Sequence, residues 1–228
     1  MEATGVIADV DRTMRALLLA EVMPGGSVEV SFEAPTRDWS ARRTGPAINV
    51  YLADLRENLD RRSADIVEVR DESGVVVARR PRERVFSLTY ALTAWATTAD
   101  DDHELLGAAL AGLLRHDYLP AQYAAGIIVE LVEAGRFPAV RVGLPTFSDK
   151  LATELWGAVG AEYRPTLWVV IDVPIPAGVA VDAGPPQTRP PSYVFSDEAT
   201  VRTEKVLGVS PDDPTRIRTR SREAAPTP

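Results

Sequence analysis

The stretch VFSLTYALTAW, residues 85–95, is the most regular segment of the sequence. Its larger apolar side chains alternate with small or hydroxyl-bearing ones, which is the two-residue period of a β-strand. The segment that follows, ADDDHELLGAALAGLLRHDYLP (99–120), changes to apolar spacings of three and four, which predict a helix from about Asp102 to His116. The side chains expected to form the buried stripe of this helix are Leu105, Leu106, Ala109, Leu110, Leu113 and Leu114. A strand followed by a helix therefore stands at the centre of the predicted fold.

Further strands and helices are predicted on both sides of this pair from the same two periods. The predicted strands are 28–32, 47–55, 66–70, 75–79, 140–144 and 166–175. The predicted helices are 6–23, with Asp9 and Asp11 on its solvated face, and a segment after Ser148, which can cap a helix. Segment 166–175 is apolar on both faces, as expected of a central strand. The fold class is therefore α+β, a mixed or antiparallel sheet with about three flanking helices.

The chain changes character at residue 177. Residues 177–228 hold eight of the 18 prolines and show no helical period, so they cannot bury enough apolar surface to offset the entropy cost of ordering. We therefore predict one domain at 1–176 and a proline-rich, extended or disordered C-terminal arm at 177–228. Within the arm, Ser192–Val209 is an apolar island that can add a strand to a neighbouring sheet, and a flexible tail is the alternative.

Charge and cysteine content exclude several classes of protein. The 228 residues include 25 basic and 33 acidic ones, for a net charge of −8, and no cysteine. Disulfides and cysteine-based catalytic or metal sites are therefore excluded. A net negative chain also disfavours nonspecific contact with nucleic acid, so no nucleic-acid partner is expected. The first residues, MEATGVIADVD, do not resemble a signal peptide, and we expect synthesis and assembly in the cytoplasm.

No motif in the sequence indicates an enzyme. A nucleophile elbow, a phosphate-binding loop and a dinucleotide fingerprint are all absent. The two histidines, His103 and His116, lie on one predicted helix at azimuths about 140° apart, so they do not readily share a ligand. Asp101 and Glu104 have the spacing of a helix cap, and a small enzyme built on Asp101 and His103 is the alternative. We predict no catalytic residue, no cofactor and no metal.

Three groups of residues are candidates for contacts with other proteins. Trp39, Arg42 and Arg43 form a predicted exposed cluster of residue types common at interfaces, and loop packing with a cation–π contact is the alternative. The apolar island contributes Tyr193 and Phe195. The arm carries arginines at alternate positions, which would share one face of an extended segment and clamp an acidic partner or nucleic acid, or else form a solvated tail. These are Arg216, Arg218, Arg220 and Arg222.

Four stretches, which together cover most of residues 6–175, carry a resemblance to a known family. They are IADVDRTMRALLLAE (7–21), VSFEAPTRDWSARRTGPAINVYLADLREN (30–58), RRPRERVFSLTYALTAWATTADDDHELLGAALAGLLRHDYLP (79–120) and LWGAVGAEYRPTLWVVIDVPI (155–175). The run T-A-W, acidic residues, H-x-L-L-G and L-L-R-H-D-x-L-P is the most specific part. The chain resembles the cap, or tail-terminator, family of extracellular contractile injection systems, such as the caps of the Photorhabdus virulence cassette and the antifeeding prophage.

The resemblance implies a structural role and a fold like that of phage tail-terminator domains, with no catalytic residues. It implies a six-fold ring of copies of this chain, which sits on the last inner-tube ring, contacts the last sheath ring and closes the end of the particle distal to the baseplate. The alternative within the same particle is a neck-like adaptor or a membrane-tethering factor. A membrane contact is not indicated by any segment.

Overall fold

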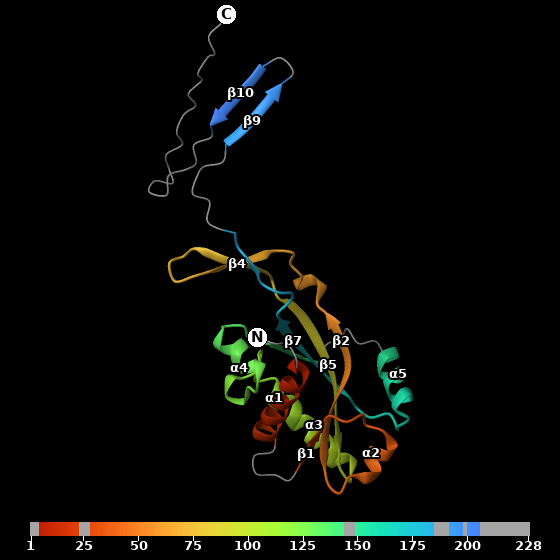
Figure 1. The fold of residues 1–228 in the computed structure, drawn as a ribbon. Helices are drawn as coiled ribbons and strands as arrows, with labels where there is room; N and C mark the ends of the chain where they lie inside the picture. Colours follow the sequence, from red (N-terminus) through yellow and green to blue (C-terminus); the bar gives the residue numbers. More distant parts are fainter. Residues whose placement is uncertain (1–4, 23–27, 144–148, 185–191, 198–199, 206–228) are drawn as a thin grey trace, which may run out of the picture. The chain divides into compact units, whose positions relative to one another are not determined.

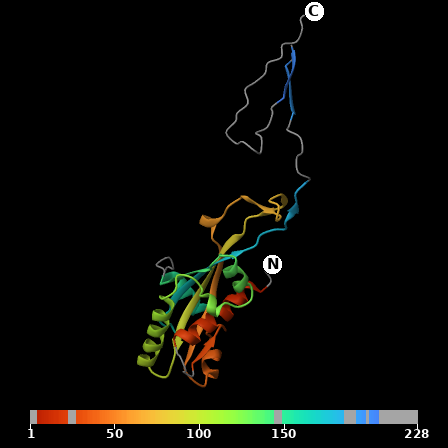
Figure 2. The ribbon, with the colours of Figure 1, turned by 90° about the vertical axis from the view of Figure 1, so that its left-hand side faces the viewer.

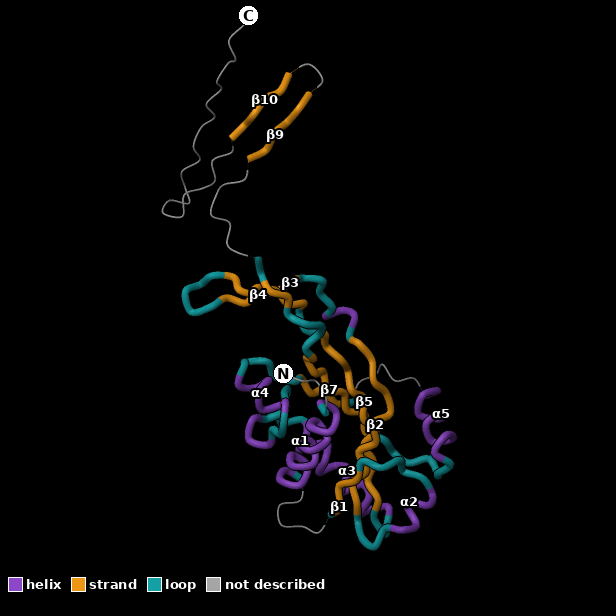
Figure 3. Tube along the Cα trace, in the orientation of Figure 1, coloured by secondary structure: helices purple, strands orange, loops and turns teal. Residues whose placement is uncertain are grey.

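The computed structural model describes residues 5–22, 28–143, 149–184, 192–197 and 200–205 (Figure 1). By their contacts, the residues form two compact units. The first is made of Met1–Val67 and Arg80–Ala180, and the second of Glu68–Arg79 and Val181–Pro228. Figure 3 shows that helices and strands alternate through the first unit, whereas the second contains strands and loops.

The first unit is built on a five-stranded sheet with the strand order β1-β2-β5-β7-β6. Its strands are β1 (Glu29–Ser31), β2 (Ala47–Glu57), β5 (Arg84–Trp95), β6 (Ala139–Val142) and β7 (Leu167–Ile175). β1 runs parallel to β2, and every other pair of neighbours is antiparallel. The predicted mixed sheet is therefore confirmed. β5 lies at the centre of the sheet, and β7 is an interior strand, as its apolar sequence predicts.

One face of this sheet is covered by α1 (Val6–Glu21), α3 (Ala99–Leu113) and α4 (Ile127–Glu133), which lie on the same side of the strands in Figures 1 and 2. The core between them and the sheet is largely aliphatic. Leu88 and Leu92 of β5 and Met14 and Leu17 of α1 are at most 1% exposed. Full burial of a side chain of this size contributes about 1.5–3 kcal/mol, so this face supplies most of the hydrophobic stabilisation.

The opposite face carries α2 (Arg37–Arg42) and α5 (Asp149–Val159) (Figure 1). A second and smaller cluster, of Trp39, Trp95 and Trp156, fills the space there. α1, α3 and α5 are the three helices that the sequence predicts. It does not predict α2 and α4, because helices of six and seven residues are too short to show a clear period. Ser148, the expected cap of α5, lies outside the described residues.

The predicted start of α3 is three residues too late. The helix begins at Ala99, and the Thr98 hydroxyl caps it by accepting a hydrogen bond from the Asp101 N–H at 3.2 Å. The same hydroxyl donates to the Asp101 carboxylate at 2.7 Å. Asp101 therefore takes part in a helix cap, but as the third residue of the helix, whereas the spacing of Asp101 and Glu104 predicts it as the capping residue itself.

The predicted buried stripe of α3 is also partly wrong. Leu105, Ala109 and Leu113 are buried, but Leu110 and Leu114 are 37% and 64% exposed. At about 100° per residue, the row of Leu110 and Leu114 is turned away from the row of Ala109 and Leu113. Leu105, Ala109 and Leu113 belong to the core, whereas of the outer row only Leu106 packs partly against it.

A three-stranded sheet is formed by β3 (Ile66–Arg70), β4 (Val76–Pro81) and β8 (Val181–Asp182). Most of it belongs to the second unit, but the first two residues of β3 and the last two of β4 belong to the first unit. β3 and β4 correspond to the predicted strands 66–70 and 75–79, and they pair with each other across a tight turn. Asp71 holds this turn by accepting hydrogen bonds from the N–H groups of Ser73 and Val75 at 2.9 and 3.0 Å. β9 (Ser192–Asp197) and β10 (Thr200–Lys205) pair as an antiparallel hairpin. Among the described residues, no helix has the length and apolarity that crossing a membrane requires.

Candidate functional site

The tryptophan cluster lies at the end of β5 that leads into α3. Trp39, Trp95 and Trp156 are 4%, 4% and 3% exposed. The rings of Trp39 and Trp95 meet edge to face at 5.2 Å between centroids, and those of Trp95 and Trp156 lie 6.3 Å apart. The three indole N–H groups donate to the hydroxyls of Ser31, Thr93 and Thr166 respectively. Each buried indole N–H therefore has a hydrogen-bond acceptor, and the three tryptophans form part of the hydrophobic core.

Two arginines pack on Trp95. The guanidinium carbons of Arg43 and Arg164 lie 5.2 and 4.2 Å from the centroid of its ring, within cation–π range. Arg164 also forms an ion pair with Asp102 at 2.6 Å, and Arg43 donates to the Trp95 carbonyl at 3.0 Å. Partial burial, together with the like charge of Arg164, lowers the pKa of Arg43. These contacts join α2, α3 and the end of β5.

The exposed cluster predicted for this segment is wrong for Trp39, which is buried. Arg43 is half-buried and stacks on Trp39 at 5.6 Å, which is the alternative that the sequence left open. Arg42 is exposed and pairs with Glu33 at 3.3 Å, so its role in an interface stays a prediction. Tyr193 and Phe195 lie on β9, and their interface role also stays a prediction. Arg216, Arg218, Arg220 and Arg222 lie outside the described residues.

A depression of about 230 Å³ opens beside the N-terminus of α3. Its lining includes Ala94, Ala99, His103, Glu162 and Arg164. The alternative of an enzyme at Asp101 and His103 finds little support there, because both side chains are exposed. Within the described part of the chain, no group of three or more side chains is arranged to hold a metal ion.

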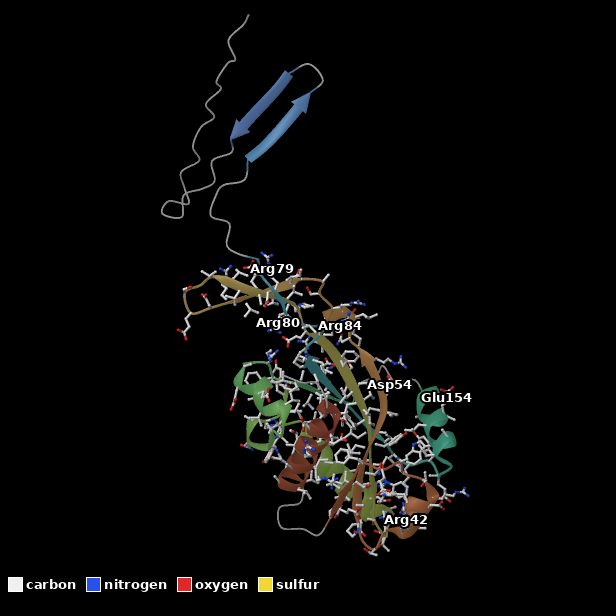
Figure 4. All side chains as sticks on the ribbon, in the orientation of Figure 1. Arg42, Asp54, Arg79, Arg80, Arg84 and Glu154 are labelled. Carbon is white, nitrogen blue, oxygen red and sulfur yellow. The ribbon has the colours of Figure 1, made fainter. Side chains whose placement is uncertain are left out.

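A larger groove of about 680 Å³ lies at the other end of the β5–β7 pair, where Val85 pairs with Pro174. We call it the arginine groove; it is lined by Arg61, Val67, Arg80, Arg82, Glu83, Val85, Tyr118, Gly135, Arg136, Phe137 and Pro174. Arg136 pairs with Glu83, and the rings of Tyr118 and Phe137 are 6.1 Å apart. Figure 4 shows Arg80 and Arg84 together at this end of the sheet and Arg42 at the far end. The sequence does not predict the groove, because separate segments of the chain form it.

Asp172 of β7 is a buried carboxylate, 4% exposed, beside this groove. It accepts hydrogen bonds from the Ser87 hydroxyl at 2.6 Å and from Arg141 at 2.9 Å to each oxygen. Arg61, which lines the groove, lies 3.9 Å from it. Because buried carboxylates need such partners, Asp172 fixes β5, β6 and β7 to one another. The interpretation of β7 as apolar on both faces misses this residue.

Asp9 is not on a solvated face, contrary to the sequence prediction. It is 7% exposed, and its carboxylate accepts a hydrogen bond from the Ile127 N–H at 2.9 Å, at the start of α4. Gly126 has φ 55°, and a Cβ at this position would collide with the Asp9 carboxylate. Asp9 therefore joins α1 to α4, and glycine is required where the two meet.

Asp11 also departs from the solvated face that the sequence predicts. It is half-buried and accepts a hydrogen bond from the Tyr90 hydroxyl at 2.7 Å. Burial raises the pKa of Asp11, although the bond from Tyr90 and the charges of Arg15 and Arg12 oppose that shift. The pKa of Tyr90 is also raised, first by burial and then by the charge of Asp11.

The fold of the chain is shared with terminators of contractile injection systems. The PVC sheath/tube terminator of an extracellular contractile injection system, in its extended state, matches with a TM-score of 0.63 at 22% identity, over 84% of this chain and 64% of that one. The anti-feeding prophage cap, a tube-terminating cap, matches with a TM-score of 0.56 at 20% identity, over 80% and 59%. This chain thus spans 64% and 59% of the lengths of the two proteins. No curated protein matches it significantly.

The family follows from the sequence as well. A family model described as the Pvc16 N-terminal domain matches residues 9–189, which is most of the chain, and the chain belongs to that family. The predicted resemblance to the cap family and the predicted fold class are both confirmed.

Proposed function

We propose that the chain is a structural cap, which terminates and closes the baseplate-distal end of the tube and sheath of a contractile injection system as a hexameric ring. The observation that carries this proposal is the family match over residues 9–189. The two similar solved structures are both terminators, which supports the same role. The proposed partners are other copies of the chain, the last inner-tube ring and the last sheath ring. Assembly is proposed to take place in the cytoplasm, and no catalytic function is proposed.

A subunit of a terminating ring must meet two structural requirements. A ring needs a heterologous contact that closes on itself, and a terminator needs one face that matches the polymer and another that offers no further docking site. A rigid sheet with two unlike ends is suited to the heterologous contact between neighbouring subunits. For contacts with the polymer we propose Arg42 and the predicted arm residues. The contact residues proposed in the arm are Tyr193, Phe195, Arg216, Arg218, Arg220 and Arg222.

Particle length tests the proposed function. Particles from the native producer should have a narrow length distribution when the chain is present, because polymer growth is stopped at a fixed point. Deletion of the gene should give a broad distribution with open ends, and wild-type protein should restore the narrow one. Electron microscopy of negatively stained particles measures both. Unchanged lengths after deletion, with loss of particle attachment, would favour the adaptor or tethering role.

A matched substitution addresses the enzymatic alternative. His103→Ala removes the exposed imidazole at the α3 depression without touching the core. A cap that carries this change should restore the wild-type length distribution in full. Failure of a folded His103→Ala protein to do so would favour chemistry at this site.

A further inference from the structure

We propose that the arginine groove of one copy of this chain binds the acidic N-terminal end of α3 in the next copy, and that this contact builds the ring head to tail. The inference rests on the proposed function, since it assigns the subunit contact of the proposed ring. It concerns the first unit alone, because both surfaces belong to that unit.

The receiving surface carries positive charge that the chain itself leaves unpaired. Arg136 is paired with Glu83, and Arg61 lies 3.9 Å from the buried Asp172. Arg80 and Arg82 also line the groove, and no carboxylate among the described residues pairs with either side chain. The exposed rings of Tyr118 and Phe137, at 54% and 48%, add apolar area on the rim. Arginines next to exposed aromatic rings are the combination found at the centres of protein interfaces.

The acidic surface has the complementary composition. Asp100, Glu104 and Glu162 are exposed, and no basic side chain among the described residues pairs with them. We call these three residues the acidic edge. Glu162 lines the α3 depression, and Asp100 and Glu104 lie on α3 next in sequence to its lining residues Ala99 and His103. Asp101 and Asp102 lie in the same turn, but both have partners within the chain. Asp101 accepts a hydrogen bond from the Thr98 hydroxyl, and Asp102 forms an ion pair with Arg164. The acidic edge therefore presents negative charge that no basic side chain of the described residues neutralises.

The two surfaces lie at opposite ends of one rigid element. Val85, in the groove, and Ala94, in the depression, are both on β5. Nine residues of strand separate them, which is about 30 Å at the rise of an antiparallel strand. β7 spans the same distance, with Pro174 in the groove and Pro165 in the depression just before the strand begins. A head-to-tail contact requires two unlike patches on opposite ends, and this sheet holds them at a fixed separation.

Charge complementarity favours a second copy of this chain as the occupant of the groove. Residues 1–176 carry 18 basic and 26 acidic residues, so a basic groove is an exception on an acidic body. A neighbouring copy brings the matching acidic edge in the same stoichiometry. Such a contact steers association through long-range attraction and weakens as salt screens it.

A charge swap tests the contact. The variant Arg80→Glu/Arg82→Glu reverses the groove, and Asp100→Lys/Glu104→Lys reverses the acidic edge; all four side chains lie outside the core. Each variant alone should weaken oligomer formation by at least about tenfold, because like charges then face each other. An equimolar mixture of the two variants, or all four changes in one chain, should restore it. Native mass spectrometry at low salt measures the oligomers, and Arg37→Glu, an exposed change in α2, is the matched control.

Cysteine cross-linking gives an independent measurement, because the chain has no cysteine of its own. A protein with both Arg82→Cys and Asp100→Cys should form a ladder of covalent oligomers with a short bis-maleimide on tube ends. Either single variant should stop at dimers, since each chain then offers one thiol. The control pair Arg37→Cys with Asp100→Cys should give no ladder.

The results separate this inference from the proposed function. If the oligomer survives groove reversal and no ladder forms, the contact is wrong, whereas capping by a ring still stands. If groove reversal leaves the oligomer intact and releases it from the tube, the occupant is the tube and the inference is overturned. If the wild-type chain never oligomerises, in solution or on tube ends, both the contact and the ring are wrong.

Discussion

The two faces of the central sheet are stabilised in different ways. On the face of α1, α3 and α4, aliphatic side chains such as Leu88 and Met14 are fully buried. On the face of α2 and α5, three tryptophans and two stacked arginines make few but directional contacts. The first face depends on buried area and the second on geometry. The second also positions Asp102, and with it the start of α3, which bears Asp100 and Glu104 of the acidic edge.

The largest effect is expected where the tryptophan cluster is broken. Trp95→Ala should lower the free energy of unfolding by about 3–5 kcal/mol, because it leaves a large cavity and removes the ring on which Arg43 and Arg164 stack. Chemical denaturation followed by circular dichroism measures the loss. Trp95→Phe is the matched control and should cost clearly less. Equal losses for both variants would contradict stabilisation by the stacked ring, because Trp95→Phe keeps buried ring area and a face for Arg43 and Arg164.

On the aliphatic face, Leu88→Ala should lower the free energy of unfolding by about 2–5 kcal/mol, since the side chain is 0% exposed. Leu110→Ala, on the outer row of α3, is the comparison and should cost less than about 1 kcal/mol. The same denaturation experiment serves for both. A loss at Leu110 as large as that at Leu88 would contradict the exposure of this row.

The polar contact between α1 and α4 should have an intermediate effect. Asp9→Ala leaves the Ile127 N–H without its partner and should cost about 1–3 kcal/mol. Asp9→Asn keeps an acceptor oxygen and should cost less. Hydrogen exchange at the first amides of α4 gives a local measurement, and protection should fall there before it falls in β5. Unchanged protection in Asp9→Ala would refute the capping role of this carboxylate.

The smallest effect, of opposite sign, is expected at Asp11. The pKa of Asp11 in the folded protein is raised above the ordinary 3.8. Ionisation of this carboxyl therefore lowers the free energy of unfolding. The loss sets in as the pH rises from 3.8 through the raised pKa, and it persists at neutral pH. Asp11→Asn keeps an acceptor for the Tyr90 hydroxyl and removes that cost. It should stabilise the protein by no more than about 1 kcal/mol at pH 7, because solvent screens a half-exposed group.

Varying the pH provides the control for the Asp11→Asn experiment. The difference between Asp11→Asn and wild type should shrink as the pH falls through the raised pKa and vanish below 3.8, where the wild-type carboxyl is protonated in both the folded and the unfolded state. Denaturation curves at a series of pH values test this. A difference that grows on acidification would show that the charged form of Asp11 stabilises the fold.

Regular periods made the central elements of the fold predictable from the sequence. The alternation in 85–95 and the leucine spacing in 99–120 gave β5 and α3, and the apolar run at 166–175 gave β7. The end of a helix depends on caps that periodicity does not report, which is why the start at Ala99 was missed. The inner row of α3 could not be distinguished from the outer one, because leucine occupies both.

The interaction surfaces were less accessible to sequence reasoning. Trp39 has the composition of an interface residue, but its indole is buried against Trp95, which lies far away in the sequence. Asp9 looked solvated because its partner is a backbone N–H in α4, more than one hundred residues later. The arginine groove is formed by segments that the fold alone brings together. A single sequence records the residue types, whereas these contacts depend on tertiary structure.

The role proposed for this chain is to close the end of a contractile particle. Electron cryo-microscopy of intact particles from the native producer, with the chain carrying a small fused tag, tests it directly. We expect a ring of density for this chain on the last tube and sheath layers, at the end opposite the baseplate, with neighbouring copies in contact. Density at the baseplate, along the sheath, or absent from the particle would contradict it.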